Sequence, residues 1–301
     1  MRIFRWVGIG IGAIVGLMLI ALAAAYIASN ARLNKTYQIA DEQIDIPTDA
    51  ASLARGKYLV TTIGQCVDCH GDNLAGREFL NAPGIVRAVS ANLTSGKGGV
   101  GATFSTADWV RALRHGVGSN GQPLLIMPSQ NFNHLSAADL GAIIAYVKSV
   151  PPVDNVPGSS EVQLLGRVLF AAGQIDALAA ESIDHSAPPP ADLPHGATVS
   201  NGRYLVTVGG CADCHNKALS GGPITGAPPN TPPAANITPG GEISGWTDAD
   251  FVKTIRTGTN PAGKQLSTFM PFKYLGRLTD DDLRAMYLYL KTIPAKPTGA
   301  Q

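Results

Sequence analysis

Charge is scarce in this sequence. Only 15% of the 301 residues are charged, the formal net charge is +1, and no lysine- or arginine-rich run occurs. A chain without a basic surface field does not attract nucleic acid or strongly acidic partners. No nucleic-acid partner is therefore expected.

Cysteine is also scarce, and every cysteine belongs to a motif. The four cysteines form two pairs, each followed directly by histidine: Cys66-Val67-Asp68-Cys69-His70 and Cys211-Ala212-Asp213-Cys214-His215. Cys-x-x-Cys-His is the attachment signature of c-type haem. Two cysteines on one helical turn reach the two vinyl groups of one porphyrin, and the next histidine lies beneath the iron. Two covalently bound haem c groups would use all four thiols, so no disulfide is expected.

Two other chemistries use paired cysteines. A thioredoxin-like dithiol needs a βαβ context, which this sequence lacks. A zinc site needs four converging ligands, which two such pairs could supply. The histidine directly after each pair and the repeat around it favour haem over zinc.

Methionine is nearly as rare, and two of the five methionines, Met127 and Met270, occupy matching positions. Each precedes a proline in a predicted loop behind its haem motif. These two are the expected distal iron ligands, although His134 competes with Met127 for that role. Thioether ligation raises the reduction potential of haem iron, and two filled axial positions suit electron transfer. The expected iron ligands are His70, Met127, His215 and Met270.

The chain contains two copies of one design. Residues 55–61 match 201–207, and the segments around both methionines and before the last helix of each copy also match. The expected division is an anchor at 1–30, a linker at 31–51, cytochrome-like domains at 52–151 and 198–295, a proline-rich spacer at 152–197 and a tail at 296–301. Apolar residues within the spacer predict a short helix or a segment packed on the domains.

The pattern of apolar residues is helical, and no convincing alternating strand appears. Helices are predicted at 106–115 and 248–257. Two more begin after the N-caps Ser136 and Thr279 and end before proline. The expected fold is all-α.

Three matched features have two readings each. Gly56 and Gly202 either allow a close helix crossing against Tyr146 and Tyr289 or only mark helix starts. Asn-x-Thr sequences at 92–94 and 236–238 match a glycosylation sequon but are interpreted as haem-pocket loops. The tryptophans are either core residues or donors to haem propionates: Trp109 and Trp246.

One long apolar run lies near the start of the sequence. No charged residue occurs from Trp6 to Ala28, which is long enough to span a hydrocarbon core. Arg2 and Arg5 precede the run, as expected for a cytoplasmic N-terminus. A cleaved signal peptide is the alternative, although its apolar region would be shorter. Both readings place the rest of the chain outside the cytoplasm, and the retained anchor predicts a single-pass protein of a bacterial inner membrane facing the periplasm.

Each copy resembles a class I cytochrome c domain, with a helix, Cys-x-x-Cys-His, a Met-Pro loop and a closing helix. The tandem arrangement is similar to the membrane-bound cytochrome c subunits of bacterial alcohol, gluconate and aldehyde dehydrogenases. Asn236-Ile237-Thr238-Pro239 followed by Gly245-Trp246-Thr247 is typical of that group. The resemblance implies His70 and His215 as proximal ligands and Met127 and Met270 as distal ligands. Those subunits usually carry three haem motifs, whereas this chain has two.

The expected function is electron transfer in a periplasmic respiratory chain, from a dehydrogenase to quinone, another cytochrome or an oxidase. The chain itself is then a non-catalytic subunit. One alternative is a haem subunit of a terminal cytochrome oxidase. Another is a di-haem redox enzyme, which would need an iron with an open face or a free cysteine ligand.

Overall fold

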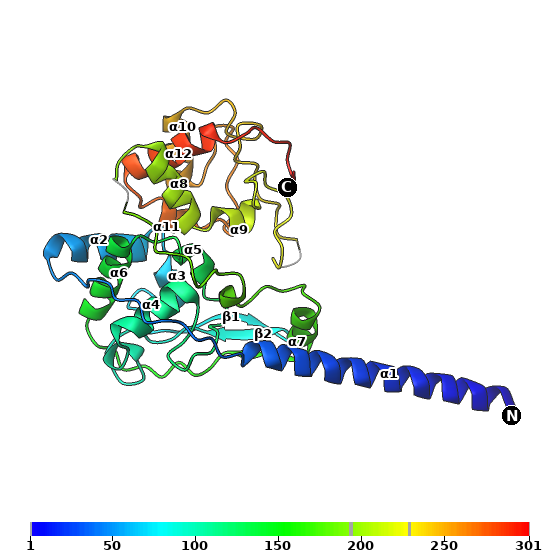
Figure 1. Cartoon of the computed structure of the whole chain (residues 1–301). Helices are drawn as coiled ribbons and strands as arrows, with labels where there is room; N and C mark the ends of the chain where they lie inside the picture. Colours follow the sequence, from blue (N-terminus) through cyan, green and yellow to red (C-terminus); the bar gives the residue numbers. More distant parts are fainter. Residues whose placement is uncertain (1, 193–194, 228–229, 301) are drawn as a thin grey trace.

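The computed structural model describes residues 2–192, 195–227 and 230–300. Figure 1 shows two mainly helical domains lying one above the other, with one long helix projecting from the side of the first. That helix, α1 (Arg2–Leu33), is the one in the described part of the chain that is long and apolar enough to cross a membrane. Its apolar side chains are exposed almost throughout.

The two domains repeat the same order of helices. The first contains α2 (Ala50–Thr61), α3 (Cys66–His70), η1 (Val100–Ala102), α4 (Thr106–His115), α5 (Ser129–Phe132) and α6 (Ala137–Ser149). The second contains α8 (Val199–Val208), α9 (Cys211–His215), α10 (Asp248–Thr257), α11 (Phe272–Leu275) and α12 (Asp280–Thr292). The predicted helices at 106–115 and 248–257 are confirmed.

Local sequence explains where these helices begin. Ser105 forms a reciprocal capping box with Asp108 at the start of α4, and Thr247 forms one with Asp250 at the start of α10. The predicted caps of α6 and α12 are also confirmed. The side chain of Ser136 accepts from Asp139 N, and that of Thr279 accepts from Asp282 N.

Two glycines set the central helix crossing of each domain. A Cβ atom built at Gly56 on α2 would lie 2.0 Å from the Ala142 carbonyl oxygen on α6. A Cβ at Gly202 on α8 would lie 1.8 Å from the Ala285 carbonyl oxygen on α12. The neighbouring tyrosines, Tyr146 and Tyr289, come within 2.9 Å of these Cβ positions. The close-crossing reading of both glycines is therefore confirmed.

The expectation that strands are absent is wrong for one small sheet. Strands β1 (Glu78–Ala82) and β2 (Val86–Val89) form an antiparallel hairpin, and β3 (Glu161–Val162) pairs with β2. These strands have two to five residues, and a register shift between Glu78 and Leu80 disrupts the alternation of side chains. Because β3 comes from the distant spacer, no local pattern could predict its pairing with β2.

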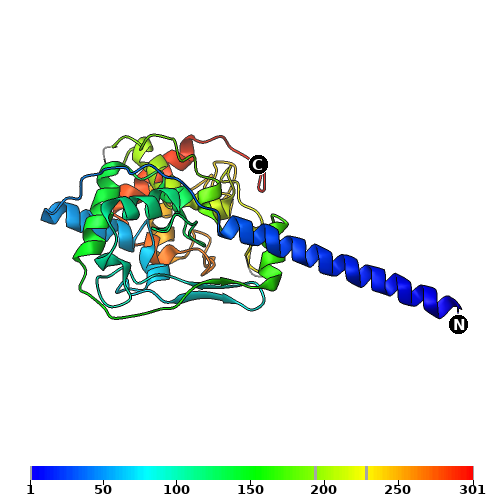
Figure 2. The same cartoon turned by 60° about the horizontal axis from the view of Figure 1, so that its bottom comes forward.

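The spacer packs on its surroundings instead of only linking the domains. Its helix α7 (Leu164–Ala171) lies beside the C-terminal part of α1, next to the domains (Figures 1 and 2). The short turn η2 (Ala179–Glu181) is joined to the same part of α1 by an ion pair between Glu181 and Arg32. A Cβ at Gly166 would lie 2.0 Å from the Ile85 carbonyl oxygen, so α7 is seated closely on the β1–β2 turn. The prediction of a short helix or a packed segment in this region is confirmed, because α7 is a short helix and packs on the first domain.

The domains meet through reciprocal contacts between matched residues. Tyr58 of the first domain donates to Asp282 of the second at 2.6 Å, and Tyr204 of the second donates to Asp139 of the first at 2.7 Å. Burial and the hydrogen bond to Asp282 raise the pKa of Tyr58 to about 12, so its hydroxyl stays a donor. Buried apolar residues of both domains form one continuous cluster. The repeat thus makes a two-fold-like interface inside one chain.

Candidate functional site

Both Cys-x-x-Cys-His motifs form short helices with matching ends. The residue before α3 is Gln65, with φ 50°, and the residue before α9 is Gly210, with φ 65°. This left-handed residue turns the chain sharply out of the preceding helix and into the motif. The motif histidines, His70 and His215, end the two helices. The structure therefore places both predicted attachment segments in the same local geometry.

A backbone carbonyl fixes the orientation of each motif histidine. His70 Nδ1 lies 2.8 Å from the Ala91 carbonyl oxygen, and His215 Nδ1 lies 2.7 Å from the Ala235 carbonyl oxygen. A carbonyl oxygen only accepts, so Nδ1 carries the proton and the lone pair lies on Nε2. Burial lowers the pKa of both histidines, against the opposing effect of these hydrogen bonds. A neutral imidazole with Nε2 available is the form that ligates haem iron.

The Asn-x-Thr loops hold those carbonyls in place. Asn92 and Asn236 are almost fully buried, and in each loop the threonine two positions later donates its amide and hydroxyl to the asparagine Oδ1. Each asparagine Nδ2 reaches across to the segment after the last helix, to Val153 O at 2.8 Å in one domain and to Lys296 O at 2.8 Å in the other. These side chains support the loops behind the histidines, and the asparagines are too buried to accept a glycan.

The cysteines do not fit a reactive dithiol. Burial raises the pKa of Cys66 to about 12 and that of Cys69 to about 11, and the pKa of Cys211 also rises to about 12. Redox dithiols instead have lowered thiol pKa values. Among the described residues, no three His, Cys, Asp or Glu side chains cluster in a way that could hold a metal ion.

The predicted distal methionines occupy equivalent, half-buried loops. Met127 and Met270 both pack against the core, and each is followed by a proline and a short helix, α5 or α11. A matched arginine from the preceding long helix braces the turn that follows each of these short helices. Arg114 donates to the carbonyl oxygens of Asn133 and Leu135, and Arg256 does the same in the second domain to Gly276 and Leu278.

One buried polar atom in the first domain is left unpaired. Trp109 is 4% exposed, and its indole Nε1 finds no hydrogen-bond acceptor among the described residues. Buried N–H groups are normally satisfied, because leaving one unpaired costs about 1–3 kcal/mol. A propionate oxygen of haem would satisfy this donor, so the site fits the group that the motifs imply. Trp246 is half-buried, and its backbone carbonyl accepts from the Tyr287 hydroxyl.

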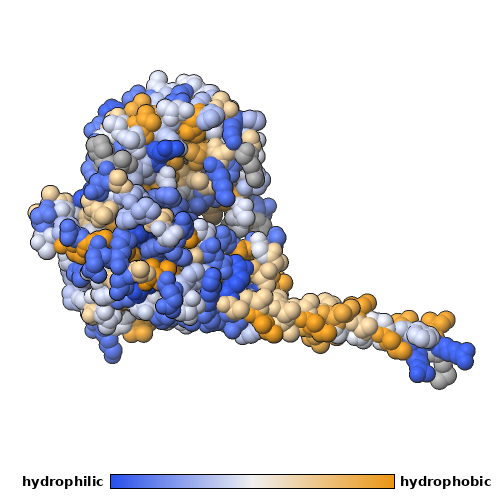
Figure 3. Space-filling model, viewed as in Figure 1, coloured by the Kyte–Doolittle hydropathy of each residue, from blue (hydrophilic) through white to orange (hydrophobic). Residues whose placement is uncertain are grey.

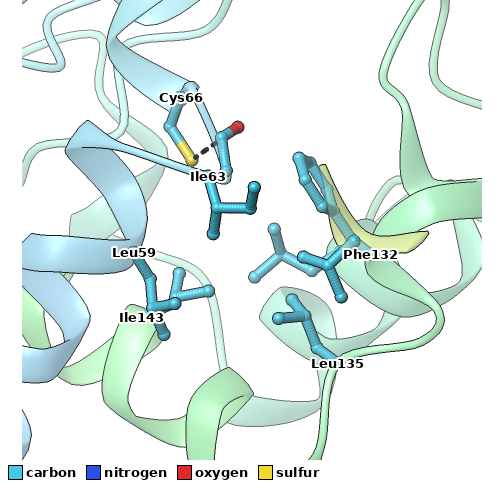
Figure 4. A pocket seen from close by; sticks show the side chains of 9 residues that line it. Leu59, Ile63, Cys66, Phe132, Leu135 and Ile143 are labelled. Carbon is cyan, nitrogen blue, oxygen red and sulfur yellow. Dashed lines mark hydrogen bonds between the residues drawn. The ribbon is translucent and has the colours of Figure 1, made fainter. Parts of the chain in front are cut away.

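An apolar cavity adjoins the first attachment helix (Figure 4). Cys66 lies at one side of it, and its Sγ contacts the Gly64 carbonyl oxygen at 3.7 Å. Val208 of the second domain contributes to the same lining, so the second domain reaches the cysteine side of the first site. His70 and Met127 do not line this cavity. Its lining is Leu59, Ile63, Gly64, Cys66, Leu113, Phe132, Leu135, Ile143 and Val208.

The sequence alone did not point to some residues around the sites, and it left the role of His134 undecided. His134, the competing ligand, is exposed on the loop after α5. The bracing arginines and the aspartates inside both haem motifs were not singled out as functional. The repeat itself carried the signal, because each of these residue types occurs at matched positions in both copies: Asp68, Arg114, Asp213 and Arg256.

Comparison with protein families finds a separate match for each domain. Residues 51–147 match the family described as "Cytochrome C oxidase, cbb3-type, subunit III", and residues 199–294 match the family described as "Cytochrome c". Cytochrome c domains imply haem c, and two such groups fit two domains.

Three relatives span most of the chain. It is 29% identical over 278 residues to the fructose dehydrogenase cytochrome subunit of Gluconobacter japonicus, covering 85% of this chain and 56% of the relative. It is 29% identical over 284 residues to the gluconate 2-dehydrogenase cytochrome c subunit of Pantoea cypripedii, covering 86% and 62%. A diheme cytochrome c-type protein of Cereibacter sphaeroides is 26% identical over 274 residues, covering 77% and 83%. The chain thus spans a little over half the length of the two dehydrogenase subunits.

Proposed function

Because the chain consists of two cytochrome c domains in tandem and is homologous to cytochrome c subunits of fructose and gluconate dehydrogenases, we propose that it is a di-haem electron-transfer subunit. It accepts electrons from a dehydrogenase and passes them to quinone, another cytochrome or an oxidase. The observation that carries this proposal is the repeated site: an oriented histidine after two cysteines, followed by a Met-Pro loop that leads into a short helix.

The residues have distinct tasks in this proposal. Haem c supplies the one-electron chemistry when it is bound. Cys66, Cys69, Cys211 and Cys214 attach the two groups, and four residues ligate the irons. The carbonyls of Ala91 and Ala235 hold the proximal imidazoles in one tautomer and one orientation. With haem bound, the thioethers of Met127 and Met270 would favour the reduced iron and would leave no open coordination site for a substrate. The iron ligands are His70, Met127, His215 and Met270.

We also propose that α1 anchors the chain in a bacterial inner membrane, with both domains in the periplasm. The apolar helix and the two arginines before it support this arrangement. The division of the chain then follows the expected boundaries: anchor 1–30, linker 31–51, domains 52–151 and 198–295, spacer 152–197 and tail 296–301. Residues 193–194 of the spacer lie outside the described residues.

Ligand-binding spectroscopy of the full chain tests the electron-transfer role. The protein is produced with a haem-attachment system, its haem content is measured as the pyridine haemochrome, and the reduced protein is exposed to carbon monoxide. Two haems per chain with no carbon monoxide adduct are expected, because both axial positions are filled. An adduct at either haem would indicate an open iron and favour a redox enzyme.

A second candidate role is a haem subunit of a terminal oxidase, because the first domain matches the cbb3-type subunit III family. Co-purification from solubilised membranes of the producing organism separates the two roles. A dehydrogenase catalytic subunit in the tagged complex supports the main proposal. A copper- and haem-containing oxidase core in that complex supports the alternative.

A further inference from the structure

The aspartates inside the two haem motifs each receive a hydrogen bond from the other domain. Asp68 Oδ1 accepts from the Tyr274 hydroxyl at 2.6 Å, and Lys273 Nζ lies 3.4 Å from the same oxygen. Asp213 Oδ2 accepts from Asn131 Nδ2 at 2.6 Å. The two contacts are reciprocal, because Asn131 and Tyr274 occupy equivalent positions in the repeat. Figure 1 shows α3, α5 and α11 gathered where the domains meet.

Each contact joins the distal loop of one domain to the attachment helix of the other. Tyr274 lies four residues after Met270, on the short helix that the methionine's carbonyl begins through a 2.8 Å hydrogen bond to Phe272 N. Asn131 stands in the same relation to Met127. The acceptor aspartates lie two residues before the motif histidines, on single-turn helices. Each methionine loop is therefore linked, through its short helix and one hydrogen bond, to the other domain's attachment helix.

The contacts also offset the negative charge of the two aspartates. A carboxylate close to a haem stabilises the more positive oxidised iron and lowers its reduction potential. A hydrogen-bond donor or a cation on the carboxylate offsets that effect. Asp68 has both a hydroxyl and an ammonium group, whereas Asp213 has amide donors from Asn131 and, at 3.5 Å, Gln130. The Asp68 side chain is 46% exposed, so solvent weakens the effect without removing it.

We propose that Tyr274 and Asn131 are positioning residues that act across the domain boundary, each tuning the reduction potential of the haem in the other domain. The proposal rests on the di-haem assignment above. It assigns the second domain a direct influence on the first haem, and the first domain the equivalent influence on the second.

Redox titration of the full chain by NMR tests this proposal. The shifted haem-methyl resonances of each haem are followed separately, and the Met127→Ala and Met270→Ala variants assign them. Tyr274→Phe is expected to lower the potential of the first-domain haem while leaving the second unchanged. Asp68→Asn is expected to raise the potential of the first-domain haem. Tyr274→Phe should have no further effect in that background, as a double-mutant cycle requires for one shared interaction.

The matched control is Tyr287→Phe, which removes a tyrosine hydroxyl in the second domain that contacts Trp246 O and not the first domain. This control should leave the first-domain haem unchanged. A Tyr274→Phe shift confined to the second-domain haem, or no shift at either haem, would overturn the proposal. Haem content is measured in parallel: fewer than two haems in the parent chain would contradict the di-haem assignment itself.

A separate observation concerns the surface around the end of α1. The guanidinium of Arg167 on α7 lies 4.5 Å from the Tyr26 ring, and it donates to Ser29 Oγ at 3.1 Å. The guanidinium of Arg32 lies 3.7 Å above the Phe170 ring. Helix α7 is therefore held against the last turns of α1, where the uncharged run of the anchor ends.

The outer side of α7 is apolar and exposed. Leu164 and Leu165 are 59% and 51% exposed, while Gly166 and Phe170 face the protein. Arg167 is the only charged residue in this eight-residue helix. In Figure 3 apolar residues continue from α1 onto the edge of the body where the helix leaves it. A short helix with one apolar face beside a membrane-spanning helix has the character of an interfacial segment.

We infer that the leucine side of α7 lies in the outer interface of the same bilayer that holds α1, giving the protein a second membrane contact. This contact restrains the tilt of the two domains on the membrane. The inference rests on the proposal that α1 is an anchor. The partner of the exposed leucines is the surface of the lipid bilayer.

Photo-crosslinking in nanodiscs of phosphatidylethanolamine and phosphatidylglycerol tests this inference. p-Benzoylphenylalanine replaces one residue at a time in the full chain, at Leu164 or Leu165, at Leu17 in α1, and at Leu288 as an exposed control in the second domain. Lipid adducts are expected at the first three positions and not at Leu288. Adducts at Leu17 alone, or protein adducts replacing lipid at Leu164 in native membranes, would overturn the inference. No adduct at Leu17 would instead contradict the anchor.

Discussion

The two domains share one backbone design but compensate charge differently at matched positions. Asp139 and Asp282 are both buried, and each accepts a tyrosine hydroxyl from the other domain. Asp139 also forms an ion pair with Arg55 at 2.7 Å, whereas Asp282 accepts a hydrogen bond from the neutral amide of Asn201. Burial alone would raise the pKa of Asp139, but the hydrogen bonds and charge of Arg55 lower it. The repeat has kept its geometry while its electrostatics diverged.

A second difference is a pair of histidines that is sensitive to acid. One of the two belongs to the first domain, and the matching position of the second domain holds no histidine. His115, at the end of α4, is 5% exposed, and its Nδ1 lies 3.1 Å from Nδ1 of His185 in the spacer. The matching position in the second domain is Thr257. Burial, followed by the nearby positive groups His185, Arg114 and Arg111, lowers the pKa of His115 to about 4. The two domains are therefore expected to have similar haem ligation and different responses to charge and pH.

The largest effect is expected where the domains are most alike. Gly56→Ala and Gly202→Ala each place a methyl group 2.0 and 1.8 Å from a carbonyl oxygen, far inside the 3.0 Å below which real Cβ contacts essentially never occur. Each should lower the free energy of unfolding by roughly 3 kcal/mol or more, since the helices must separate. Denaturant unfolding followed by circular dichroism measures the loss. Gly245→Ala is the control, because no atom lies within 4 Å of its Cβ position; equal losses in all three would refute this account of the crossings.

The second largest effect is expected from acid, because of the two matched helices α4 and α10 only α4 ends in a buried histidine. Because the pKa of His115 falls from 6.5 to about 4 on folding, the unfolded chain takes up the proton first. The contribution of His115 to the free energy of unfolding is therefore fully present above about pH 6.5, and it is lost progressively as the pH falls towards 4. The decline amounts to about 3 kcal/mol at 1.36 kcal/mol per pH unit. His115→Gln should remove this part of the slope in unfolding experiments from pH 7 to 4, and an unchanged slope would contradict the assignment.

A smaller contrast is expected between the partners of the two buried aspartates. Arg55→Ala leaves Asp139 buried without its cation and should cost about 2 kcal/mol, because the arginine is itself partly exposed. Asn201→Ala removes a neutral donor from Asp282 and should cost about 1 kcal/mol. The comparison is made by chemical unfolding at neutral pH in low salt. Equal costs would show that the charge difference between the domains has no energetic consequence.

The sequence was sufficient for features that are local or repeated. Attachment helices, capped helices and the close glycine crossings follow from motif spacing and from the same residues recurring in both copies. The pairing of β3 with β2 was not predictable, because β3 lies in the spacer and is only two residues long, and the register shift in β1 obscured the alternation of the hairpin. The cross-domain bonds of Asp68 and Asp213 were also out of reach, since they depend on how two similar surfaces dock. Long-range pairing of this kind leaves no periodic trace in a single sequence.

The central claim, that both domains hold a His/Met-ligated haem, is tested most directly by the near-infrared methionine–iron charge-transfer band of the oxidised protein. The account predicts a band intensity corresponding to two haems, which falls by half in Met127→Ala and by half in Met270→Ala while the haem content stays at two. A parent band that accounts for one haem or none, or an intensity that survives either substitution, would contradict it.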